Sequence, residues 1–172
     1  NITALLQSIE AAEPFSILDF GCGPGRDLET FRRLGHLATG LEGSARFAAM
    51  ARAVSGCEVL QQNFLELDLP AGHFDGVFAN AALFHVPNQE LPRVLRNLHT
   101  TLKPGGTLFS SNPRGDDQEG WNEDRYGAFH SLDAWRRYMS AANFIELAHF
   151  YRPPGRPLEQ RDPRSGRSAA VD

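Results

Sequence analysis

The glycine-rich stretch at residues 18–27, Leu-Asp-Phe-Gly-Cys-Gly-Pro-Gly-Arg-Asp, decides the fold of this chain. A short apolar run at residues 16–20 leads into it and predicts a buried strand, and residues 27–34 follow with the spacing of a helix. Glycines allow a tight turn and a closely bound ligand, because they carry no Cβ. The helix N-terminus behind the turn offers free N–H groups and a partial positive charge. The stretch therefore predicts a nucleotide-type site, and the alternative is a tight turn that binds nothing.

Outward from this turn, strand patterns alternate with helical ones, which is typical of a mostly parallel sheet covered by helices. Further strands are predicted at residues 37–41, 58–61, 74–79, 107–111 and 144–151. Helices are predicted at residues 3–12, after Ser44, at residues 91–102 and after Ser131. The helix after Ser44 is expected to bury Phe47, Met50, Ala51 and Val54. The fold class is α/β, a three-layer doubly wound sandwich.

The C-terminal part of the chain is expected to differ from this body. Residues 112–130 are polar and long for a connection, which favours a functional loop. Residues 1–151 are interpreted as one domain, and residues 152–172 as a disordered tail, vector-encoded from about residue 161. Because the tail is rich in proline, no antiparallel strand is expected after residue 151, so the sheet would have no seventh, antiparallel strand. An exposed sheet edge would then favour a weak homodimer.

Composition narrows the class of protein. The chain has 172 residues, of which 41% are hydrophobic and 22% charged, as expected of one globular domain. It contains no apolar run long enough to span a membrane and no recognisable secretory signal. Cys22 and Cys57 cannot form a disulfide framework, which favours the cytoplasm. The net charge of −4 argues against a nucleic-acid partner, and no metal site is predicted.

The spacing of the glycines indicates which class of nucleotide-type cofactor the turn would bind. Arg26 stands where a dinucleotide fold usually places its third glycine, which disfavours a nicotinamide or flavin enzyme. Glu42 ends the second strand, about 20 residues after Gly21, where a carboxylate can accept two hydrogen bonds from a ribose diol. Its alternative role is that of a solvated loop acid. Asn63 and Phe64 follow the third strand, where an amide and a ring suit an adenine.

Four motifs in order resemble those of the class I S-adenosylmethionine-dependent methyltransferase family, over residues 15–151. They occupy residues 19–25, 40–44, 74–80 and 102–108. The resemblance implies that Asp19 and the glycines hold the methionine part of the cofactor, that Glu42 holds the ribose, and that Asn80 and Ala81 lie beside the sulfonium. The implied cofactor residues are Asp19, Gly21, Cys22, Gly23, Gly25, Glu42, Gly43, Asn63, Phe64, Asn80 and Ala81.

One departure from the family pattern concerns the adenine. The family commonly has Asp at the position of Asn63. An asparagine amide carries both a donor and an acceptor, so it can still pair with the edge of an adenine ring.

A methyl group on a sulfonium is already activated, so such an enzyme mainly aligns the acceptor and excludes water. His85 is the candidate general base, although a packing histidine at a helix start fits equally. The candidate substrate residues are Arg114, Trp121, Tyr126 and His130. The predicted reaction is methyl transfer to a small molecule, with S-adenosylhomocysteine as product. The alternatives are a cofactor-binding protein without transferase activity and, weakened by Arg26, an NAD-dependent oxidoreductase.

Overall fold

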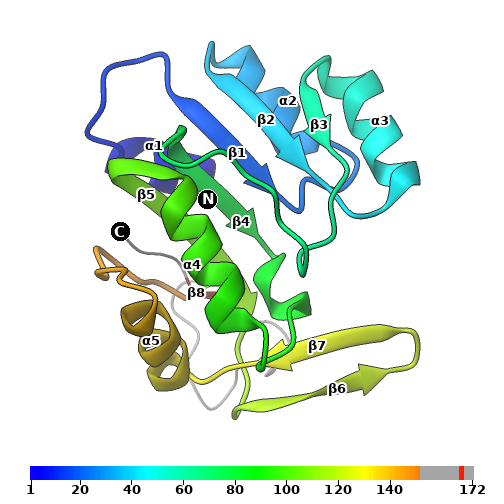
Figure 1. Ribbon diagram of the computed structural model, residues 1–172, viewed down its shortest axis with the longest axis vertical. Helices are drawn as coiled ribbons and strands as arrows, with labels where there is room; N and C mark the ends of the chain where they lie inside the picture. Colours follow the sequence, from blue (N-terminus) through cyan, green and yellow to red (C-terminus); the bar gives the residue numbers. More distant parts are fainter. Residues whose placement is uncertain (152–166, 169–172) are drawn as a thin grey trace.

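A mostly parallel sheet carries the fold (Figure 1). The computed structural model describes residues 1–151 and 167–168. The strands are β1 (Ser16–Phe20), β2 (Leu37–Leu41), β3 (Glu58–Leu60), β4 (Phe74–Asn80), β5 (Leu102–Pro113), β6 (Gln118–Asn122), β7 (Arg125–Phe129) and β8 (Arg167–Ser168). The helices are α1 (Ile2–Ser8), α2 (Arg26–Arg33), α3 (Ala45–Ser55), η1 (Leu83–His85), α4 (Leu91–Thr101) and α5 (Leu132–Ala141).

The order of strands in the main sheet is β3-β2-β1-β4-β5-β8. The first five pair in parallel, and β8 pairs antiparallel with β5. The order reverses between β1 and β4, because β2 and β3 lie on one side of β1 and the later strands on the other. Open α/β sheets bind ligands beyond the carboxyl ends of their strands at such a reversal. The predicted α/β fold is confirmed, and the glycine-rich turn lies at the reversal point.

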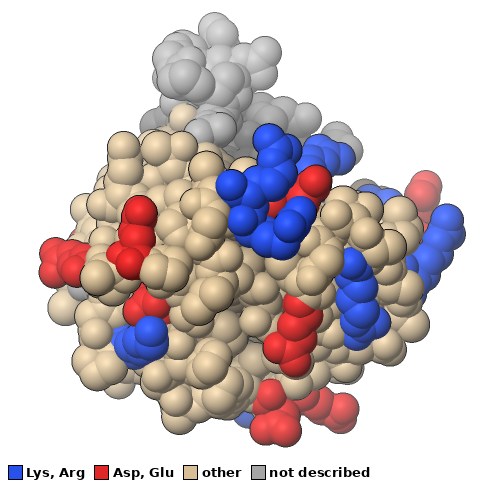
Figure 2. All heavy atoms as spheres, turned by 90° about the horizontal axis from the view of Figure 1, so that it is seen from above, with Lys and Arg blue, Asp and Glu red and all other residues tan. Residues whose placement is uncertain are grey.

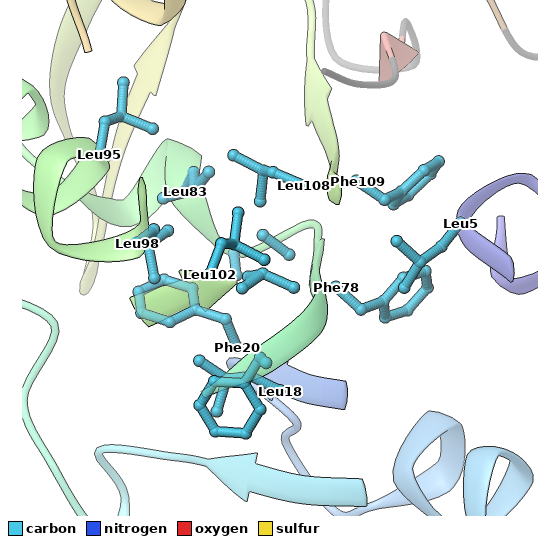
Figure 3. Close-up of a cluster of buried hydrophobic side chains, with 14 of the residues drawn as sticks. Leu5, Leu18, Phe20, Phe78, Leu83, Leu95, Leu98, Leu102, Leu108 and Phe109 are labelled. Carbon is cyan, nitrogen blue, oxygen red and sulfur yellow. The ribbon is translucent and has the colours of Figure 1, made fainter. Parts of the chain in front are cut away.

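Helices cover both faces of the sheet. On one face α1 packs against Gly76, where an added Cβ would lie 2.8 Å from Cδ1 of Ile9, and Phe31 of α2 meets Phe78 edge-on. On the other face lies α4, which crosses in front of the sheet in Figure 1 and contacts α5. The helix predicted at residues 91–102 forms, and its apolar residues at helical spacing are buried (Leu91, Val94, Leu95, Leu98). They join side chains of β1, β4 and β5 in the core that Figure 3 shows.

The helix after Ser44 forms as predicted, and the Ser44 hydroxyl accepts a hydrogen bond from the Phe47 N–H. Its predicted buried face is largely wrong, because Phe47, Met50 and Val54 are between 41% and 51% exposed. The buried positions are instead small: Ala48, Ala51 and Ser55. A Cβ added at Gly25 would lie only 2.7 Å from Cα of Ala51. The close approach of α3 to the glycine-rich turn therefore requires small side chains and turns the large ones outward.

Residues 112–130 were predicted to form a loop, and that prediction is wrong. They contain the antiparallel hairpin of β6 and β7, which crosses the lower end of the molecule in Figure 1. Trp121 and Tyr126 are cross-strand partners beside its turn, with ring centroids 5.7 Å apart. Polar residues dominate β6 because all of it is exposed, so the strand lacks the apolar alternation that marks a half-buried strand.

The strand predicted at residues 144–151 is not formed. Phe144 is buried against His99, but Ile145 and Leu147 are 70% and 52% exposed, so the apolar alternation is not used for packing. The segment instead follows α5, where both terminal oxygens of Glu146 bind Arg136 at 2.5 and 2.7 Å. These contacts tie the segment to α5.

The expectation of no antiparallel strand after residue 151 is also wrong at two residues. Ser168 and Arg167 of β8 pair with Asn112 and Pro113 at the end of β5. This strand lies at the edge of the sheet. The expectation of disorder and of a vector-encoded end falls otherwise on residues 152–166 and 169–172, which lie outside the described residues.

The packing of α3 on the turn leads to a prediction. Ala51→Leu is expected to lower the free energy of unfolding by about 1–3 kcal/mol, because the larger side chain has no space beside Gly25. Met50→Leu, one residue away on the exposed face, serves as the matched control and is expected to change it by less than about 0.5 kcal/mol. Urea unfolding followed by circular dichroism measures both. Equal effects of the two substitutions would contradict the packing described.

Candidate functional site

The glycine-rich turn is held by the end of the neighbouring strand β2. The N–H groups of Gly21 and Cys22 both donate to the Leu41 carbonyl, at 2.9 and 3.0 Å. The next N–H in the turn, that of Gly23, donates to Oε2 of Glu42 at 2.9 Å. Three consecutive donors of the turn are thus satisfied by two residues at the carboxyl end of β2.

The three glycines of the turn are required for different physical reasons. A Cβ at Gly21 would lie 2.7 Å from Cβ of Ala82 and 3.1 Å from Cζ of Phe64, and Gly25 lies against α3. A Cβ at Gly23 would meet nothing within 4 Å. All three have φ between +52° and +91°, the left-handed region in which L side chains are strained. Space for a ligand close to the backbone is therefore found at Gly23, whereas the other two glycines are required by packing.

Glu42 links the turn to α3. Its Oε2 accepts from Gly23 and its Oε1 accepts from the Ser44 N–H at 2.8 Å. The residue is partly buried, so it is not simply a solvated loop acid. Each carboxylate oxygen has a second lone pair that these bonds leave available. Gly43, between these residues, comes close to the loop after β3, where its Cβ position is 3.5 Å from the Gln62 carbonyl oxygen.

Asp19 is buried beneath the turn. Its Oδ2 has no hydrogen-bond partner, and the residue is 2% exposed. Burial, reinforced by the nearby carboxylates of Asp27 and Glu42, raises its pKa well above the ordinary value for an aspartic acid. Burial and the same acidic surroundings, Asp19 and Glu42, raise the pKa of the Cys22 thiol to about 12. Cys22 is therefore protonated, and the acidic cluster favours a ligand that carries positive charge.

Asn80 joins three elements at the carboxyl end of β4. Its amide N–H donates to Oδ2 of Asp27 at 3.0 Å, and its Oδ1 accepts from the Ser111 hydroxyl at 2.7 Å and from the Asn1 amide at 2.8 Å. The next residue, Ala81, has a φ of +56° and donates its N–H to the Ser111 carbonyl at 2.8 Å. A non-glycine residue in this region is strained, which is common where a chain lines a functional site. The sequence interpretation missed Ser111, which no motif marks.

The predicted adenine residues lie near the turn. The Phe64 ring stacks on Phe20 with centroids 4.3 Å apart, and its tip approaches Gly21. Asn63 is exposed, and its Oδ1 accepts from the Leu65 N–H at 3.0 Å. The side-chain oxygen of Asn63 thus stabilises the local turn.

The candidate acceptor residues fall into separate places. The hairpin lies against residues 83–90, where Nδ1 of His85 is 2.9 Å from the Tyr126 carbonyl oxygen. The Tyr126 hydroxyl donates to Glu119, whose Oε2 also accepts from the Asn88 N–H. Burial, with Glu119 next, raises the pKa of Tyr126 to about 12. Trp121 is 73% exposed at the end of the hairpin.

Arg114, before the hairpin in the sequence, and His130, after it, line a small hollow that Trp121 does not line. Nε2 of His130 is 2.7 Å from Oδ1 of Asn88, and burial lowers the pKa of this histidine. The Arg114 guanidinium lies over the Tyr151 ring, 5.4 Å from its centroid. The structure therefore pairs His85 with Tyr126 and His130 with Arg114, and Trp121 lines neither place.

The contact with Tyr126 fixes the proton on the His85 ring. A carbonyl oxygen only accepts, so Nδ1 of His85 is the protonated nitrogen. In the neutral ring Nε2 then carries a lone pair. This arrangement is the one a general base requires.

This geometry, a glycine-rich turn at the reversal point of an open α/β sheet with an acidic strand end across it, defines a nucleotide-binding domain of the doubly wound class. The family model of the methyltransferase domain matches residues 17–106. Trans-aconitate 2-methyltransferase of Rhodopseudomonas palustris (strain BisB18) is 33% identical over 141 residues, which cover 80% of this chain and 53% of that protein. The chain belongs to the class I S-adenosylmethionine-dependent methyltransferases. It spans about half the length of the curated relatives it matches.

Two solved structures show the same fold. The 1,6-didemethyltoxoflavin-N1-methyltransferase of Burkholderia thailandensis, with 1,6-didemethyltoxoflavin and S-adenosylhomocysteine bound, has a TM-score of 0.73 and 22% identity, covering 90% of this chain and 68% of that one. The [4+2]-cyclase SpnF has a TM-score of 0.70 and 22% identity, covering 87% of this chain and 58% of that one. A fold shared by proteins with such different names does not by itself identify a reaction.

Two further features of the described residues concern membrane proteins and metalloproteins. None of the helices in residues 1–151 is long and apolar enough to cross a membrane. The same part of the chain contains no cluster of three or more histidine, cysteine or acidic side chains arranged to hold a metal ion.

The buried carboxyl of Asp19 leads to a prediction about pH. A carboxyl whose pKa is raised on folding stabilises the protonated folded state, so its contribution becomes unfavourable as the pH rises above about 4, the ordinary pKa of an aspartic acid. Asp19→Asn stays neutral, and we expect it to unfold at a higher temperature than the unsubstituted protein at about pH 8, with the difference shrinking towards about pH 4. Calorimetry across this range measures the difference. The exposed Asp68→Asn is the control, and a lower Tm for Asp19→Asn at high pH would contradict the assignment.

Proposed function

We propose that this chain binds S-adenosylmethionine and transfers its methyl group to a small-molecule acceptor, releasing S-adenosylhomocysteine. The observation that carries the proposal is the open space at Gly23, bordered by the carboxylate of Glu42, in a chain of the methyltransferase family. The relative from Rhodopseudomonas palustris is named for a small acceptor, trans-aconitate, and the Burkholderia thailandensis structure for another, 1,6-didemethyltoxoflavin.

The residues of the turn fit this cofactor. Asp19 offers a buried carboxyl oxygen without a partner, and Asp19, Asp27 and Glu42 together favour the positive ammonium and sulfonium groups of the molecule. When bound, the cofactor supplies a methyl group activated by its sulfonium. The free lone pairs of Glu42 suit a ribose diol, and Phe64 with Asn63 suits an adenine. Asn80 and Ala81, at the carboxyl end of β4, complete the proposed cofactor-binding set.

Titration calorimetry with S-adenosylmethionine, S-adenosylhomocysteine and NAD tests the cofactor. We expect binding of the first two and none of NAD. Glu42→Ala is expected to weaken binding by about 1.5–3 kcal/mol, because hydrogen bonds to a charged group are lost. Glu58→Ala, an exposed acid at the start of β3, is the control and should bind normally. Folded protein that gives no heat with either methionine compound would refute the proposal.

For the acceptor side we propose His85 as general base, through Nε2. The Tyr126 carbonyl sets the required tautomer, and the ring contact with Phe84, 3.9 Å between centroids, limits ring rotation. An acceptor hydroxyl that reached Nε2 would lose its proton as the methyl group transfers. The proton would then leave through the exposed edge of the imidazole.

His85→Gln tests this role. We expect kcat to fall by about 10²–10⁴-fold, the usual contribution of a positioned base, with the affinity for S-adenosylhomocysteine unchanged. His99→Gln, at the far end of α4, is the matched control and should retain activity. A normal rate in His85→Gln with a hydroxyl acceptor would leave His85 with a packing role only.

The second candidate function is cofactor binding without methyl transfer. A structure of the same fold is named for a cyclase, which supports keeping this alternative. Release of S-adenosylhomocysteine in the presence of an acceptor separates the two, because a domain that only binds the cofactor releases none. An acceptor panel of small carboxylic acids and phenols is the appropriate start.

We also propose a cytoplasmic protein without a nucleic-acid partner. Both cysteines are free thiols, which suits a reducing compartment. Figure 2 shows one face on which acidic and basic side chains are interspersed over a largely uncharged surface. The weak homodimer stays a prediction, which now rests on exposed apolar side chains. Residues 144–151 do not form the expected strand edge, but Ile145 and Leu147 there remain exposed.

A further inference from the structure

Three buried side chains with unpartnered polar atoms meet in one hollow. Asn112 at the end of β5, His130 before α5 and Trp135 within α5 all line it. They are 5%, 6% and 5% exposed. Both terminal atoms of the Asn112 amide, Nδ1 of His130 and Nε1 of Trp135 have no hydrogen-bond partner. These are four of the six such side-chain atoms in the part of the chain that the structure describes. Native proteins leave few buried polar atoms unpaired, so their concentration in one place points to a ligand.

The nearest acidic groups are engaged elsewhere. Asp117 accepts from the N–H and hydroxyl of Ser131, at 2.7 and 3.1 Å. Glu119 accepts from Asn88 and Tyr126. Neither carboxylate lines the hollow, and the described residues that line it include no acid. Within residues 1–151, therefore, no carboxylate lines the hollow beside these donors.

The chemistry of the hollow is that of a donor site. Nε1 of Trp135 and Nδ2 of Asn112 carry N–H groups, and Arg114 adds a positive guanidinium held over the Tyr151 ring. His130 bonds through Nε2 to the Oδ1 acceptor of Asn88, so its Nδ1 carries a lone pair while the ring is neutral. Burial, which lowers the pKa of His130, keeps it neutral near pH 7. One cation with several N–H donors matches a carboxylate.

The hollow lies next to the proposed cofactor site. Ser111 and Asn112 are neighbours in β5, so their side chains lie on opposite faces of the sheet. Ser111 bonds to Asn80, and Asn112 borders the hollow behind it. On the other side, Asn88 connects His130 to the loop that begins at His85. The hollow is therefore linked to the end of β5 through Asn112 and, through His130 and Asn88, to the loop after the candidate base.

We propose that this hollow binds a carboxylate of the methyl acceptor. The inference rests on the proposed function and names its substrate class. The hollow is narrow, with a volume of about 10 Å³, so only one oxygen-sized group can enter it. That oxygen is bound by Trp135 and Asn112, and the second oxygen is bound at the mouth by Arg114, which is only partly buried. Nδ1 of His130, an acceptor while the ring is neutral, is then left for a hydroxyl of the same ligand.

Trp135 itself reports on the hollow. The chain has two tryptophans, so Trp121→Phe leaves Trp135 as the single indole fluorophore. In this background we titrate crotonate, its neutral amide crotonamide, and trans-aconitate, and follow the Trp135 emission. We expect a saturable change with the two carboxylates and none with the amide. An equal response to crotonate and crotonamide, or no response to any probe, overturns the proposal.

Two substitutions locate the binding. Arg114→Met and Asn112→Leu are each expected to weaken carboxylate binding by about tenfold or more, because each removes a charged or N–H donor. Arg137→Met, an exposed arginine on α5, is the matched control and should bind normally. Equal loss in all three variants would show a nonspecific charge effect and overturn the proposal.

Thermal unfolding of Asn112→Leu distinguishes a ligand site from a buried water. With the orphaned amide removed, the Tm is expected to stay the same or rise. A fall of several degrees, together with no response of the unsubstituted hollow to carboxylates, would mean that a structural water alone occupies it. Titration of S-adenosylhomocysteine on the same protein tests the proposed function separately. If that ligand binds and the carboxylates do not, only the present inference fails.

Discussion

The hydrogen bonds between the glycine-rich turn and the end of β2 are the interaction on which the rest of the site depends. Gly21 and Cys22 donate to one carbonyl, that of Leu41, and Gly23 donates to the carboxylate of Glu42. These bonds hold the turn in a left-handed backbone conformation that only glycine adopts without strain. They also bring the acidic end of β2 to the position where α2 begins. A turn without this support would have neither the shape nor the charge of a binding site.

The same turn limits what can pack around it. Gly25 requires α3 to approach with Ala51, and the large side chains of that helix are exposed as a result. Asp19 accepts a backbone hydrogen bond from Leu28, but its other oxygen is buried without a partner, and burial raises its pKa, so ionising it costs stability. Under the proposed function, stability and cofactor binding oppose each other at this residue.

The acceptor side is assembled differently, from parts of the chain that follow the sheet. The hairpin of β6 and β7 lies against residues 83–90 through His85, Asn88 and Tyr126. Because these contacts also reach His130, one network joins the candidate base to the hollow at the end of β5. In the proposed function, the hairpin and the cofactor turn thus belong to separate parts of the chain.

The sequence by itself determined the alternation of strands and helices, the turn at residues 18–27 and the acid that ends β2, because each depends on local periodicity or on a backbone that glycine alone permits. It also indicated the family, through motifs that are short and continuous. Only the tertiary structure decided which face of α3 is buried, since Gly25 and Ala51 are far apart in the chain. The proton position on His85 and the hollow between Asn112 and Trp135 were beyond sequence patterns for the same reason. Both are set by contacts between segments 20 or more residues apart, and local periodicity carries no record of such contacts. The hairpin pairs residues close in the sequence, and it was missed because β6 is exposed along its length and so lacks apolar alternation.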